Sequence, residues 1–68
     1  MIRLETGNKL RDQTGHEYEV LSVGADKYTR TTQYPMSYVV RRDDGVEREV
    51  SGGTINAMYR EGTLKVLA

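Results

Sequence analysis

Apolar and polar residues alternate most clearly between residues 38 and 50. Tyr38 and Val40 stand on one side of an Asp-Asp-Gly sequence and Val46 and Val50 on the other. A period of two residues is typical of a β-strand with one buried face, and a glycine-containing turn between two such runs indicates a hairpin. The pattern therefore predicts a β-hairpin closed over residues 43–45.

Two registers are compatible with this hairpin. A two-residue turn at Asp44 and Gly45 places Arg41 opposite Arg48, and directly opposed like charges destabilise a strand pair. A three-residue loop that ends in a left-handed Gly45 places Arg41 opposite Glu47 and Val39 opposite Glu49 instead. We predict the second register, with an Arg41–Glu47 ion pair. Its apolar face collects Tyr38, Val40, Val46 and Val50, with Arg42 and Arg48 at the edge.

The chain before this hairpin contains a second one. Ile2 and Leu4 alternate with charged residues and indicate a short edge strand or a fraying end. Residues 9–11 and 16–23 are predicted strands around a type I turn at 12–15. Apolar residues change parity between Val20 and Leu21, which predicts a bulge or sharp bend there.

Residues 24–36 show no sustained period and contain the only proline, so they are predicted to form a long loop. After the central hairpin, Thr54 is a plausible N-cap for a helix of at most two turns that carries Ile55 and Met58 and ends at Gly62. Residues 63–67 then form a final strand.

The predicted order is strand, turn, strand, long loop, strand, tight turn, strand, short helix, strand. This order resembles an SH3-like small β-barrel, in which a short helical turn separates the fourth and fifth strands. We therefore expect an all-β fold: one domain over residues 1–68, built as a five-stranded SH3-like small barrel with one short helix before the last strand. The opening at residues 7–12 is also similar to the first strand of KOW-type barrels of ribosome and transcription factors. The aromatic signature with which SH3 domains bind proline-rich peptides is absent, because the chain has no Trp.

Composition limits the classes of function. A chain of 68 residues has a thin core, and it has no cysteine for disulfides or the usual structural zinc sites. The lack of cysteine also suits a reducing cytoplasm, and no apolar run is long enough for a membrane span, so we expect a cytoplasmic protein. Ten basic and ten acidic residues give a net charge of zero, so no global field attracts nucleic acid.

Enzyme chemistry has little support in the sequence. His16 is the only histidine and has no partner that would complete a metal set. The glycines after Ser51 lack the spacings of phosphate-binding loops. The acids at 43, 44, 47 and 49 are explained as solvated charge. We expect a non-enzymatic protein with no catalytic residues, no cofactor and no metal.

The candidate functional site is an acid-free window from Lys27 to Arg42. Tyrosines alternate there with basic residues, and single-stranded nucleic acids are bound by stacking on aromatic rings while cations follow the phosphates. We expect RNA or DNA to bind through six residues, namely Lys27, Tyr28, Arg30, Tyr34, Tyr38 and Arg42. A surface loop whose tyrosines fold back onto the barrel explains the same residues without a ligand.

Two alternatives remain. A protein-interaction or assembly module is the first, as a homo-oligomer or as an accessory protein of a phage or other mobile element, because a thin core gains stability from a partner chain. The second is a small enzyme assembled at a symmetric interface, as in tetrameric barrel reductases, although their active-site motif is not present here.

Overall fold

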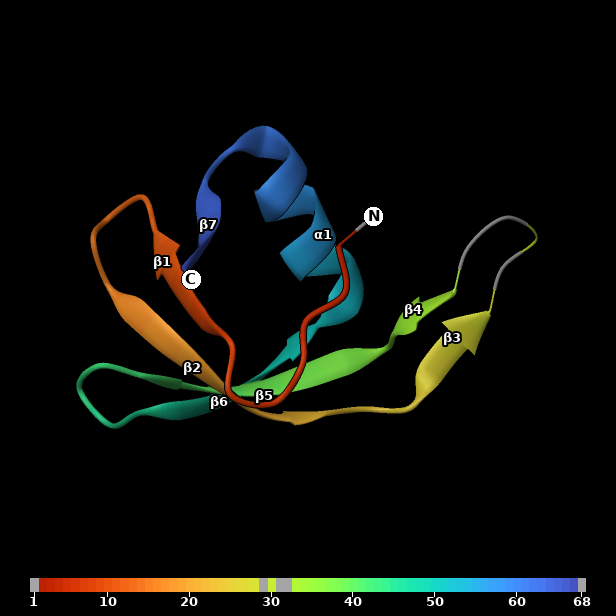
Figure 1. The fold of residues 1–68 in the computed structure, drawn as a ribbon, viewed down its shortest axis with the longest axis horizontal. Helices are drawn as coiled ribbons and strands as arrows, with labels where there is room; N and C mark the ends of the chain where they lie inside the picture. The colour runs from red at the N-terminus through yellow and green to blue at the C-terminus, as the bar shows by residue number, and fades with distance from the viewer. Residues whose placement is uncertain (1, 29, 31–32, 68) are drawn as a thin grey trace.

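The structure is a computed structural model that describes residues 2–28, 30 and 33–67. Its main layer is a five-stranded antiparallel sheet with the strand order β6-β5-β2-β1-β7. The five strands are β1 (Lys9–Asp12), β2 (Glu17–Val23), β5 (Ser37–Arg42), β6 (Glu47–Ser51) and β7 (Leu64–Leu67). The helix α1 (Gly52–Glu61) connects β6 to β7 and lies over the inner face of the sheet (Figure 1).

The central hairpin has the three-residue loop and the register expected from charge. Arg41 lies opposite Glu47 and Val39 opposite Glu49. Gly45 adopts a φ of 90°, and its amide closes the turn onto the carbonyl of Arg42 at 2.9 Å. The expectation for Arg41 was wrong, however, because its guanidinium contacts Glu19 of β2 at 3.1 Å. Glu19 and Glu47 both lie opposite Arg41, one on each neighbouring strand.

The predicted apolar face is correct for only part of the hairpin. Tyr38 and Val40 are buried and Val50 is half-buried, but Val46 is 40% exposed. Val46 follows the turn directly, beyond the reach of the helix that covers the rest of this face. The core of the described residues is completed by apolar side chains from most of the other elements, namely Leu4, Leu10, Val20, Ile55 and Leu64.

The bend predicted in the second strand is present. The pairing between β2 and β5 shifts register between Val20 and Ser22. The predicted turn at residues 12–15 is also confirmed, and Asp12 organises it: its carboxylate accepts hydrogen bonds from the amides of Thr14 and His16, both at 3.0 Å.

Two other predictions need correction. The N-terminal residues form no described strand, yet Leu4 is buried and its amide donates to the Tyr38 hydroxyl at 3.2 Å. The helix has ten residues and its N-cap is Ser51, not Thr54. The hydroxyl of Ser51 accepts the amide hydrogen of Thr54 at 3.1 Å, and this satisfies one of the free donors of the first turn. Gly62 ends the helix in the left-handed conformation, as expected.

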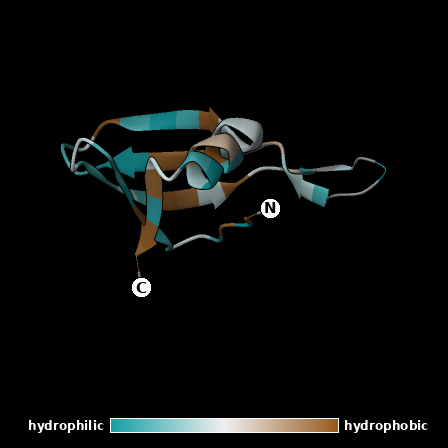
Figure 2. Cartoon of the chain, turned by 90° about the horizontal axis from the view of Figure 1, so that it is seen from above, coloured by the Kyte–Doolittle hydropathy of each residue, from teal (hydrophilic) through white to brown (hydrophobic). Residues whose placement is uncertain are grey.

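The sheet is not closed. Among the described strands β6 and β7 each pair with one neighbour, so both are sheet edges and the expected barrel is not confirmed. Figure 2 shows hydrophobic residues gathered in the strands near α1. No helix within the described residues is long and apolar enough to cross a membrane.

Candidate nucleic-acid interface

The segment predicted as a long loop contains a two-stranded ribbon. β3 (Asp26–Tyr28) and β4 (Gln33–Pro35) pair antiparallel, with Lys27 opposite Tyr34 and Tyr28 opposite Gln33. We call β3 and β4, with Arg30 between them, the arm. It projects from the end of the sheet, beyond β2 and β5 (Figure 1). The sequence pattern missed this ribbon because each strand has only three residues, too few to display a period.

Glycines allow the arm to leave the body at a close crossing. The amide of Gly24 donates to the carbonyl of Ser37 at 2.8 Å, and a Cβ on Gly24 would lie 2.6 Å from the Ser37 hydroxyl oxygen. Gly52 is still more restricted, because a Cβ there would lie 1.8 Å from the carbonyl oxygen of Pro35. Its amide donates to the carbonyl of Met36 at 2.8 Å. The base of the arm is therefore fixed directly on the start of α1.

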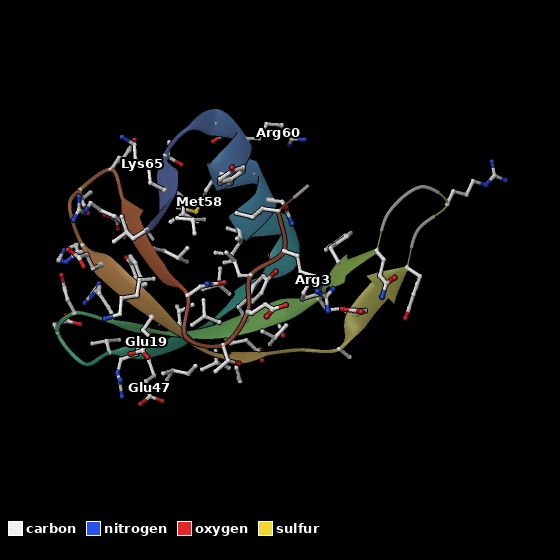
Figure 3. The ribbon with its side chains drawn as sticks, viewed as in Figure 1. Arg3, Glu19, Glu47, Met58, Arg60 and Lys65 are labelled. Carbon is white, nitrogen blue, oxygen red and sulfur yellow. The ribbon has the colours of Figure 1, made fainter. Side chains whose placement is uncertain are left out.

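Polar contacts fix the first residue of the arm. Arg3 contacts Asp26 at 2.9 Å, and Figure 3 shows Arg3 beside the base of β4. The side-chain amide of Gln33 donates to the other carboxylate oxygen of Asp26 and, at 3.3 Å, to the hydroxyl of Tyr28. The hydrogen bond from Gln33, followed by that from Arg3, lowers the pKa of Asp26. The carboxylate at the base of the arm thus stays ionised and is neutralised by Arg3, a contact between distant residues that no local sequence signal indicates.

Beyond Asp26 the arm carries exposed aromatic and basic groups. Tyr28 is 72% exposed, more than any other large apolar or aromatic side chain among the described residues. Arg30 is exposed at the bend of the arm and takes part in none of the ion pairs between described residues. The backbone of Lys27 lies in β3, but its side chain lies outside the described part of the structure. Tyr34 is half-buried beside Gly52.

The structure separates the other two expected residues from this group. Tyr38 is fully buried, so its ring does not contribute to a binding surface. Arg42 lies at the opposite end of β5 from the arm, roughly 17 Å along the strand from Ser37 at the usual rise per residue. It makes a two-pronged contact with Asp44, through Nε at 2.9 Å and through Nη2. The six predicted residues are therefore not one surface, and only Lys27, Tyr28, Arg30 and Tyr34 belong to the arm.

Asp43 and Asp44 have structural contacts. Hydrogen bonding from Arg42 lowers the pKa of Asp44 to about 2. His16 contacts Asp43 at 3.2 Å, between two exposed turns. Within the described residues no group of three or more His, Asp or Glu side chains is placed to hold a metal ion. A comparison with protein-family models, curated proteins and solved structures gave no match.

Proposed function

We propose that the protein is a small non-catalytic binding module that binds single-stranded nucleic acid through the arm. One observation carries the proposal: Tyr28 presents an exposed ring on a projecting ribbon. The charged residues of this ribbon beyond Asp26 are Lys27 and Arg30, and both are basic. Every nucleotide base has a face that stacks on an aromatic ring, while cations beside that ring contact phosphates. Beyond Asp26, which Arg3 neutralises, the arm offers both kinds of group and no carboxylate.

The architecture that we propose for the module is an SH3-like small barrel with an open seam. The strand order supports it, since the last strand returns beside the first after a short helix. Small barrels use loops and adjoining strands to bind single strands. A cytoplasmic location stays a prediction. It is supported by the lack of cysteine, because a chain without disulfides suits a reducing compartment.

The charge available on the arm sets the expected strength of binding. Two cations beyond Asp26 neutralise at most about two phosphates, which corresponds to a slope of about −1.4 for the logarithm of the binding constant against the logarithm of salt concentration on a single strand. We therefore expect modest affinity and a shallow salt dependence.

Fluorescence anisotropy with short labelled RNA and DNA single strands at several salt concentrations tests the proposal. Replacing Tyr28→Ala removes one stacking platform, and we expect affinity to fall about 5- to 150-fold, the equivalent of about 1–3 kcal/mol. Arg30→Ala should weaken binding and reduce the magnitude of the salt slope by about 0.7. A duplex of the same sequence is included, and tighter binding to it would contradict a stacking mode.

Matched controls separate the arm from the rest of the surface. Tyr59→Ala removes a half-exposed tyrosine from α1, and Arg60→Ala and Arg42→Ala each remove one positive charge away from the arm. We expect all three to bind as the unmodified protein does. Equal losses in the arm variants and the controls, or no loss in Tyr28→Ala, would contradict the proposal.

A further inference from the structure

The free edge of β6 is a second surface with the properties of a binding site, separate from the arm. Arg42 donates its amide hydrogen to Val46 and Gly52 donates to Met36, both at 2.8 Å. In an antiparallel pair the backbone groups of successive residues point alternately toward and away from the partner. With this register Arg48 and Val50 direct their backbone groups at β5, while Glu47 and Glu49 direct theirs outward. No described strand pairs with that outward edge.

The side chains of this edge differ between the two faces. Glu47 and Glu49 lie on the same face of the sheet as Arg41 and Val39, their cross-strand neighbours. Figure 3 shows Glu19 and Glu47 together on this side, away from Met58. Val50 lies on the opposite, inner face and lines a mostly apolar cavity of about 150 Å³ with Met58 and Leu64. A strand beside β6 would therefore meet two carboxylates on one face. On the other face it would meet Val50 with its apolar recess and the exposed side chain of Arg48.

Charge opposes full-length pairing of β6 with β6 of a second copy of this chain. Two β6 strands related by a two-fold axis would pair antiparallel, and the register that overlaps the whole strand places Glu49 opposite itself. A shift of two residues toward the start of the strand places Glu47 opposite Glu49 of the other copy. Like charges directly opposite one another destabilise a strand pair, and charged edge residues are a common protection against such self-pairing. Charge therefore opposes pairing of β6 along its whole length with β6 of a second copy and favours a partner strand with basic residues.

We propose that β6 accepts an extended segment of another protein as an added antiparallel strand. The segment has an apolar residue opposite Val50 and basic residues opposite Glu49 and Glu47. The residue between the two basic ones lies opposite Arg48 and is uncharged, which gives the order apolar, basic, uncharged, basic. Main-chain hydrogen bonds at an exposed edge supply affinity in this mode of recognition, and alternate side chains supply specificity. The apolar side chain extends the lining of the cavity, and the basic side chains pair with the two carboxylates.

A short capped peptide with valine at its second position, lysine at its third and fifth, and threonine elsewhere is the probe. We expect NMR titration to shift the amides of Glu47 and Glu49 and to slow their hydrogen exchange, because these amides acquire an acceptor. The amide of Arg48 already points at β5 and serves as an internal reference. Shifts centred on β7 or on the arm, or no binding, would overturn the proposal.

Backbone methylation separates strand addition from charge attraction. The third residue of the peptide directs its amide at Glu49, whereas the fourth directs its amide away from β6. We expect N-methylation of the third residue to abolish binding and N-methylation of the fourth to leave it unchanged. Equal affinity of the two methylated peptides would show simple electrostatic attraction and contradict the proposal.

One protein variant tests the role of charge. Glu49→Lys lies opposite Val39 and creates no directly opposed like-charge pair within the sheet, so the fold should survive. We expect it to weaken peptide binding about tenfold, since one attractive pair becomes repulsive. Glu61→Lys makes the same change on α1 and should have no effect, and unchanged affinity in Glu49→Lys would count against the site. Tyr28→Ala should leave peptide binding intact, so this site and the arm can fail independently.

Discussion

Two neighbouring glycines at the start of α1 have opposite roles. Gly52 lies where any side chain would overlap the carbonyl of Pro35, whereas a Cβ on Gly53 would meet nothing within 4 Å. We expect Gly52→Ala to lower the free energy of unfolding by about 1–3 kcal/mol or more, since the backbone at the base of the arm must shift. Gly53→Ala should raise it by up to about 1 kcal/mol, because alanine favours the helix. Urea unfolding of both variants checks the pair, and equal effects would contradict the close crossing.

The turn at residues 12–15 is expected to be sensitive to acid. A hydrogen bond from Thr14, supported by others from Tyr18 and His16, lowers the pKa of Asp12 to about 2. A carboxyl whose pKa is lower in the folded than in the unfolded chain stabilises the fold above its unfolded pKa of about 3.9. That contribution is lost as the pH falls towards 2.

We therefore expect the free energy of unfolding to be nearly constant between about pH 7 and pH 5 and to fall below about pH 4. Asp12→Asn should flatten this fall, because the group that titrates is removed while an acceptor oxygen remains. Chemical unfolding across this pH range provides the measurement, with Glu61→Gln on α1 as the control. An unaltered acid profile in Asp12→Asn would show that the contacts of Asp12 do not stabilise the fold.

At the scale of elements, the arm lies outside the core. Its described side chains are exposed or half-buried except for Pro35, and the buried cluster of apolar residues comes from other segments. We expect replacement of residues 27–34 by an Asn-Gly turn between Asp26 and Pro35 to keep the fold, because such turns close antiparallel strands. Circular dichroism and thermal unfolding test this, and loss of cooperative unfolding would show that the arm stabilises the sheet.

The sequence predicted the elements whose signal is local. Charge selected the register of the β5–β6 hairpin, parity predicted the bulge near Leu21, and glycine predicted the end of α1. The arm was missed because its strands are too short to show alternation. Two of the six candidate residues lie apart from the other four for a related reason. Burial of Tyr38 and the position of Arg42 depend on long-range packing, which an acid-free stretch of sequence does not record.

Over the whole molecule there is no net excess of charge, but the charged residues are distributed unevenly between regions. The net charge is zero, and the exposed face of the sheet carries ion pairs such as Arg11 with Glu17 and Arg41 with Glu19. Exposed pairs of this kind contribute little stability, but they leave that face close to neutral. Positive charge beside an aromatic ring is thus expected on the arm. On β6, Glu47 and Glu49 take part in none of the ion pairs between described residues and lie on one face, while Arg48 lies on the other.

The central claim is that the arm, and not the sheet, contacts nucleic acid. NMR mapping of a short single-stranded RNA or DNA on the isotopically labelled protein tests it most directly. We expect the largest shifts in Asp26, Tyr28, Arg30 and Gln33, with Arg42 and the β6 edge unaffected. Shifts centred on Arg42 or spread over the sheet, or none at low salt, would contradict the account.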